Sequence, residues 1–113
     1  GCVPMKGKIV LIPFPFTDLT ATKLRPALVL HEGEHDVVVA FISSKTPAKT
    51  VESGIQITST LPGFSKTGLK ADSVIRLDKV ATILKDLIVG EIGELDDDLR
   101  ADVNAKIATL FRL

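Results

Sequence analysis

The chain contains no tryptophan and no tyrosine, and it has a single cysteine, Cys2. One cysteine excludes an internal disulfide framework and is typical of a reducing compartment, so we expect a cytoplasmic protein. A lone thiol without a partner histidine or aspartate also makes a cysteine nucleophile improbable. The absence of Trp and Tyr argues against a groove of the kind in which aromatic side chains bind peptides.

Long apolar runs and an excess of one charge are also missing. No run approaches the length of about 20 residues that spans a bilayer, so we expect no membrane contact. No glycine-rich phosphate-binding motif occurs. The formal net charge is zero, but residues 1–90 hold 11 Lys/Arg against 8 Asp/Glu, whereas residues 91–113 hold 3 against 6. An ordinary solvated surface explains this, although a nucleic acid would meet local positive charge.

The apolar pattern predicts a single domain, residues 1–113, that is mainly β. Short apolar runs predict strands over residues 8–12, 27–31, 37–42, 54–58, 73–77, 80–84 and 88–92. Pro13 and Pro15 are expected to end the first strand, and Pro26 to stand at the first position of the second. From Asp96 onward the apolar residues recur at helical spacing, with Asp96 or Asp97 as N-cap. We therefore expect a small, strongly curved antiparallel sheet or barrel with a C-terminal helix.

Three polar clusters emerge from these strands. They are Asp18, Thr20, Lys23 and Arg25; then Ser43, Ser44 and Lys45; then Arg76 and Asp78. Arg25 precedes a proline and should be extended. Arg76 and Asp78 alternate with core residues, so they share one face with Cα atoms about 6.6 Å apart.

Taken singly, each cluster is better explained by a surface ion pair or a satisfied strand end. Together they supply cations, a carboxylate and hydroxyls, which are the groups needed to cleave a phosphodiester.

The sequence gives little indication of a metal or cofactor. His31 and His35 lie four residues apart, a spacing that suits a helix, but this region is predicted to be a strand and a turn. With Glu32 and Glu34 nearby, a surface hairpin is a better interpretation than a zinc site. We therefore expect no metal ion and no cofactor.

The order "GKIVLIPFPFTDLTATKLRPALVL", "VVVAFISS", "DSVIRLDKVATI" and an amphipathic helix resembles the MazF/PemK (Kid) family of toxin endoribonucleases, from Gly7 to Leu113. The resemblance implies a compact SH3-like barrel, a homodimer, and metal-independent cleavage of single-stranded RNA at short sequence motifs. It also implies a cognate antitoxin that covers the RNA site. Unshielded strand edges in so small a barrel independently favour a homodimer.

The resemblance assigns catalytic roles to four residues. Arg25 falls at the family's catalytic arginine before proline, and Ser43 falls where a Thr or Ser assists the transition state. Arg76 and Asp78 match a V-x-R-x-D pattern and resemble the acid and the base. Where related toxins carry a glutamate in the loop before Arg-Pro, this chain has Thr20, with Asp18 the nearest acid. The expected base is therefore Asp78 first and Asp18 second.

The remaining polar residues of the first two clusters are expected to bind RNA: Asp18, Thr20, Lys23, Ser44 and Lys45. Candidates for base stacking are Phe14, Phe16 and Phe64. Two alternatives stay open, a gyrase poison of the CcdB type, which has a similar fold, and a non-catalytic SH3-like binding module.

Overall fold

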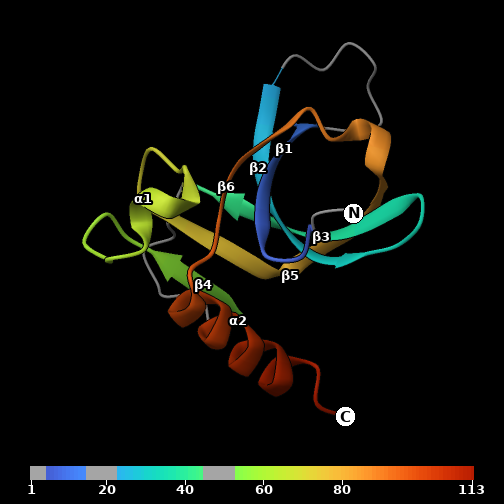
Figure 1. Ribbon diagram of the computed structural model, residues 1–113. Helices are drawn as coiled ribbons and strands as arrows, with labels where there is room; N and C mark the ends of the chain where they lie inside the picture. The colour runs from blue at the N-terminus through green and yellow to red at the C-terminus, as the bar shows by residue number, and fades with distance from the viewer. Residues whose placement is uncertain (1–4, 15–22, 45–52) are drawn as a thin grey trace.

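The computed structural model describes residues 5–14, 23–44 and 53–113. Within them, six strands form one antiparallel sheet in the order β4-β5-β3-β2-β1-β6. The strands are β1 (Lys8–Phe14), β2 (Lys23–Glu32), β3 (Asp36–Ser43), β4 (Gly54–Ile57), β5 (Ser73–Leu84) and β6 (Gly90–Glu94). The helical elements are α1 (Phe64–Thr67), the 3-10 turn η1 (Lys85–Leu87) and α2 (Asp97–Leu110). The sheet curls into a half-barrel with α2 at one end (Figure 1), which confirms the expected fold class.

The sheet buries side chains on both faces, because successive residues of a strand point to opposite sides. On β2, Leu28 belongs to one core cluster, whereas Ala27 and Val29 belong to the other. The first cluster is covered by Leu99 and Val103 of α2. The second is closed by partly buried residues of η1 and the segment after it. This double burial explains why the strands are continuous apolar runs in the sequence.

The C-terminal helix begins where the sequence predicts. Asp96 is the N-cap, and its Oδ1 accepts a hydrogen bond from the backbone N–H of Leu99 at 2.8 Å. Asp97 and Asp98 follow in the first turn, where negative charge complements the helix dipole. Of the two N-cap candidates, Asp96 is therefore the one used.

Several strand boundaries differ from the predicted ones. β1 continues through Pro13 to Phe14, and β2 begins at Lys23, three residues before Pro26. Pro26 pairs with Leu11 of β1, while the register with β3 begins only at the next residue. Among the described residues, the strand has a neighbour on one side only at this point, which is where a strand tolerates proline. The last predicted strand is also shifted, to Gly90–Glu94, and the short helix α1 was not predicted.

The two strands predicted over residues 73–77 and 80–84 are a single strand, β5. Its register with β3 passes from Ala40↔Val80 directly to Phe41↔Arg76. Residues 77–79 of β5 therefore form a bulge, an insertion that bends a strand and re-aims its side chains. The gap that the sequence predicts between two strands, at Asp78 and Lys79, is this bulge within one strand.

Candidate active site

The sheet divides at Phe41. The β2–β3 register runs from Glu32↔Val37 to Ala27↔Phe41, after which β2 continues beside β1 and β3 continues beside β5. In Figure 1 the N-terminal part of β2 and the arrowhead of β3 accordingly diverge. A pocket of about 560 Å³ lies between the two branches, within the size range of ligand sites in proteins. It is lined by Arg25, Phe41, Ile42, Ser43, Arg76, Asp78, Lys79 and Val80.

Arg76 and Asp78 form a two-point ion pair at this pocket. Nε of Arg76 donates to Oδ1 of Asp78 at 2.9 Å, and a terminal guanidinium nitrogen donates to Oδ2 at 2.7 Å. Ile75 and Leu77, which alternate with them, are fully buried, as the strand pattern predicts. The ion pair that the sequence offers as the simpler explanation of this cluster is therefore present, and both of its members lie on one strand.

This pairing shifts the pKa values of both groups. The hydrogen bonds from Arg76 lower the pKa of the Asp78 carboxyl, and a hydrogen bond from Ser53 adds to the effect. The hydrogen bond to Asp78 raises the pKa of Arg76 in turn. Both groups therefore stay charged at neutral pH.

The bulge of β5 positions the acidic member of this pair. Leu77 has no partner in the register with β3; its backbone N–H donates to the carbonyl of Ser53 at 3.0 Å, and its side chain lies in the core. Asp78 and Lys79, the next two residues, are exposed and line the pocket. The bulge thus turns two consecutive charged side chains toward the space between the branches of the sheet.

Arg25 and Ser43 approach the pocket from opposite branches. Arg25 is on the β2 branch, opposite Ile12 of β1, and is exposed. Ser43 is the last residue of β3 and pairs with Val74 of β5. Within the described ranges, no carboxylate forms an ion pair with Arg25, so its charge is directed to the pocket without a counter-ion from these residues.

The four residues with expected catalytic roles all line this pocket: Arg25, Ser43, Arg76 and Asp78. Of the expected RNA-binding residues, Lys23 and Ser44 are exposed beside the site without lining the pocket, and Asp18, Thr20 and Lys45 lie outside the described residues.

Sequence reasoning missed the other four lining residues, which are Phe41, Ile42, Lys79 and Val80. The signal for Lys79 was its position directly after the R-x-D pattern. Phe41 gave no signal, since it lies inside an apolar run.

Comparison with known proteins decides the family. Residues 5–111 match the family model of the PemK-like, MazF-like toxin of type II toxin-antitoxin systems. The chain belongs to this family. Comparison with the sequences of curated proteins gives no significant match.

Solved structures of MazF toxins share the fold. The toxin MazF-mt6 of Mycobacterium tuberculosis superposes with a TM-score of 0.72 at 21% identity, over 94% of this chain and 97% of that one. An endoribonuclease from Mycobacterial species, in complex with its cognate antitoxin, gives 0.68 at 20% identity, over 98% and 97%. MazE-MazF from Deinococcus radiodurans gives 0.70 at 19% identity, over 100% and 99%.

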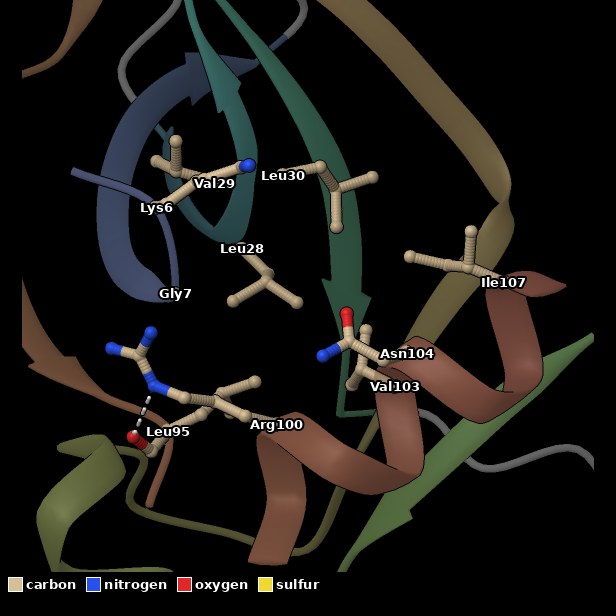
Figure 2. A pocket seen from close by; sticks show the side chains of 10 residues that line it. All are labelled: Lys6, Gly7, Leu28, Val29, Leu30, Leu95, Arg100, Val103, Asn104 and Ile107. Carbon is tan, nitrogen blue, oxygen red and sulfur yellow. Dashed lines mark hydrogen bonds between the residues drawn. The ribbon is translucent and has the colours of Figure 1, made fainter. Parts of the chain in front are cut away.

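This PemK/MazF-like chain has a second, smaller cavity of about 190 Å³ between α2 and β2 (Figure 2). Leu28, Val103 and Ile107 line part of it, and Arg100 reaches in from α2. Nε of Arg100 donates to the carbonyl of Leu95 at 3.3 Å, so this guanidinium is held by the protein itself.

Neither a metal centre nor a membrane span is found in the part of the chain that the structure describes. No three His, Cys, Asp or Glu side chains gather there as metal ligands would, and none of the described helices is long and apolar enough to cross a bilayer. His31 and His35 are exposed at the β2–β3 hairpin, where Nε2 of His35 lies 3.7 Å from Glu34.

Proposed function

We propose that this protein is a metal-independent endoribonuclease that cleaves single-stranded RNA at short sequence motifs. The observation that carries the proposal is the meeting of Arg25, Ser43, Arg76 and Asp78 at one pocket of a PemK/MazF-like toxin. In the reaction, the ribose 2′-hydroxyl attacks the adjacent phosphorus and the P–O bond to the 5′-oxygen of the next nucleotide breaks. The products are a 2′,3′-cyclic phosphate and a 5′-hydroxyl.

Each side chain has a defined task in this reaction. Asp78 accepts the proton of the attacking 2′-hydroxyl, and its lowered pKa keeps it ionised and ready to do so. Arg25 stabilises the extra negative charge on the phosphoryl oxygens, and the hydroxyl of Ser43 donates a hydrogen bond to one of them. Arg76 is the acid: it donates a proton to the 5′-oxygen as the bond from phosphorus to that oxygen breaks. Asp78, which is hydrogen-bonded to Arg76, then returns to it the proton taken from the 2′-hydroxyl.

The general base has two candidates, because the low pKa of Asp78 also makes it a weak base. Asp78 already receives hydrogen bonds from Arg76 and Ser53, so the 2′-hydroxyl replaces one of these donors when it binds the carboxylate. Asp18, the second choice, lies outside the described residues.

The same proposal covers ligands and partners. Lys23 and Ser44 extend the charged and polar surface beside the pocket, and we assign them to RNA binding together with Asp18, Thr20 and Lys45. By similarity to the mycobacterial endoribonuclease solved with its cognate antitoxin, we propose a protein antitoxin as partner. We further propose that the chain forms a homodimer and acts in the cytoplasm.

The test is incubation of the purified protein with mixed-sequence RNA in EDTA, followed by analysis of the ends of the products. We expect the wild type to cleave RNA in EDTA and to leave cyclic phosphate ends. Arg25→Ala should lose this cleavage, and Arg112→Ala should keep it. Arg112 is a matched control, since it is an exposed arginine beyond the end of α2. Undiminished cleavage by Arg25→Ala would remove this residue from the mechanism. If the wild type leaves varied RNA intact, the proposal fails, and a supercoiling assay then tests the gyrase-poison alternative.

A further inference from the structure

Phe41 stands at the point where the sheet divides, between the two arginines of the pocket. It is directly opposite Arg76 on β5 and directly opposite Ala27 on β2, two residues from Arg25. Directly paired residues in antiparallel strands have Cα atoms about 5 Å apart, and diagonal neighbours lie about 7–8 Å apart. All three side chains share one face of the sheet and line the same pocket. An aromatic ring therefore lies within one nucleotide's reach of both guanidinium groups.

We propose that Phe41 is a stacking platform for a nucleobase of single-stranded RNA, and that Lys79 contacts a phosphate next to the one between Arg25 and Arg76. The inference rests on the proposed function, since it assigns the base-binding part of the same site. Every base has a π-face, so a platform of this kind binds without selecting a sequence. The charge fits as well, because three cations and one carboxylate line the pocket, an excess of two positive charges for the RNA backbone.

The other phenylalanines are less suitable. Phe64 begins α1 and packs against the first core cluster, and Phe111 lies beyond the end of α2 with 58% of its surface exposed. The side chains of Phe14 and Phe16 lie outside those that the structure describes. Among the described side chains, Phe41 is the aromatic one that lines the pocket, in a chain without Trp or Tyr.

Phe41 also has a structural role that the experiment must separate from binding. It is half-buried and packs against the second core cluster, so that it covers the end of this core and forms part of the pocket wall. Truncation to alanine would remove both roles at once. Leucine keeps an apolar cover over the core, whereas tryptophan keeps an aromatic face.

The absence of native Trp and Tyr makes Phe41→Trp a single-fluorophore reporter. Short 2′-O-methyl RNA of mixed sequence is titrated into it, because the blocked 2′-oxygen prevents cleavage while the bases remain. We expect quenching of the tryptophan emission, no quenching by an abasic oligomer of the same length, and no quenching in the control Phe111→Trp. In a competition assay with labelled RNA, Phe41→Leu should bind about tenfold more weakly than the wild type, with an unchanged melting temperature as the check on folding.

An unquenched Phe41→Trp, or a folded Phe41→Leu that binds RNA as tightly as the wild type, would overturn the platform. Quenching by the abasic oligomer would overturn it too, because the signal would then come from the backbone. This failure differs from failure of the proposed function. Cleavage of RNA without quenching leaves the nuclease and removes the platform, whereas base-dependent quenching without any cleavage leaves the platform and removes the nuclease.

Discussion

Two cavities among the described residues each contain arginine, but they use its charge differently. At the α2 corner (Figure 2), Arg100 donates to the Leu95 carbonyl and lies 3.8 Å from Glu94. Glu94 also pairs with Lys8 at 3.1 Å and with Lys66 at 3.8 Å. At the pocket between the branches of the sheet, Arg25 has no such carboxylate among the described residues.

This contrast separates structural charge from charge that is available to a ligand. At the α2 corner the hydrogen bond from Lys8 lowers the pKa of Glu94, and the same contact raises the pKa of Lys8. The cations there surround a carboxylate and fasten β6 and α2 to the start of β1. At the other pocket a carboxylate is paired with one arginine and two further cations remain, so an incoming phosphate meets a positive site. An arginine that lines a cavity thus indicates a binding site for an anion only when its charge is not already paired with a carboxylate of the protein.

The largest expected effect on RNA cleavage comes from replacing an arginine with alanine. We compare one arginine from each cavity. Arg25→Ala should reduce RNA cleavage about 10²- to 10³-fold, as removal of one charge-stabilising donor does in other enzymes. Its melting temperature should not change, since Arg25 is exposed. Arg100→Ala should show the reverse, a lower melting temperature and unchanged cleavage by the folded protein. If both variants reduced cleavage equally, the assignment of Arg25 to catalysis and of Arg100 to stability would be wrong.

The next effect tests the base. Asp78→Asn should lower the cleavage rate about 10²-fold, at the lower end of the range for general bases because the lowered pKa of Asp78 makes it a weak one. The direction of the pKa shift also sets the pH dependence. The ionised carboxylate, and the stability that its pairing with Arg76 adds, are present above the ordinary aspartate pKa and are lost as pH falls through the lower folded value.

The rate of cleavage should therefore be independent of pH down to at least the ordinary aspartate pKa of 3.8 before it falls. The measurement is a pH–rate profile with circular dichroism at each pH to confirm folding. A fall of the rate above that value in the folded protein, absent from Asp78→Asn, would mean that Asp78 titrates higher than its pairing allows. Unchanged cleavage by Asp78→Asn would transfer the role of base to Asp18.

Much of this molecule could be predicted from local patterns. The apolar runs gave the strands and the spacing after Asp96 gave the helix, because burial and capping depend on residues near in sequence. Arg25, Ser43, Arg76 and Asp78 could be named as one group from the resemblance. Alternation along the strand correctly placed Arg76 and Asp78 on one side and Ile75 and Leu77 in the core.

What escaped prediction depends on the register between strands. The bulge at residues 77–79 arises from how β5 pairs with β3, and a polar pair inside an apolar run is equally compatible with a turn. Phe41 is one residue of an apolar run, and it becomes a pocket residue only because β2 separates from β3 there. Pro13 and Pro26 lie inside strands and not at the predicted ends for the same reason, since the sequence does not show which strand edges lack a neighbour.

A smaller effect tests the α2 corner through its backbone. Gly7 has φ +82°, and a Cβ at this position would overlap the guanidinium of Arg100. Gly7→Ala should therefore destabilise the protein by about 1–3 kcal/mol in urea unfolding. Gly90→Ala is the matched control, because nothing lies within 4 Å of its Cβ position. Cleavage per folded molecule should stay at the wild-type rate in both, and a loss in Gly7→Ala would show that this corner communicates with the active site.

The smallest effect concerns Lys79, the cation that the bulge turns toward the pocket. Lys79→Ala should weaken binding of 2′-O-methyl RNA only a few-fold, but it should reduce the slope of log K against log salt by about 1, because one phosphate contact is lost. Lys70→Ala is the matched control, an exposed lysine outside the pocket, and should leave the slope unchanged. The salt slope separates a phosphate contact from general loss of charge, since both variants lose the same charge and only one loses it at the pocket. Equal slopes for the two variants would mean that Lys79 makes no specific contact with an RNA phosphate.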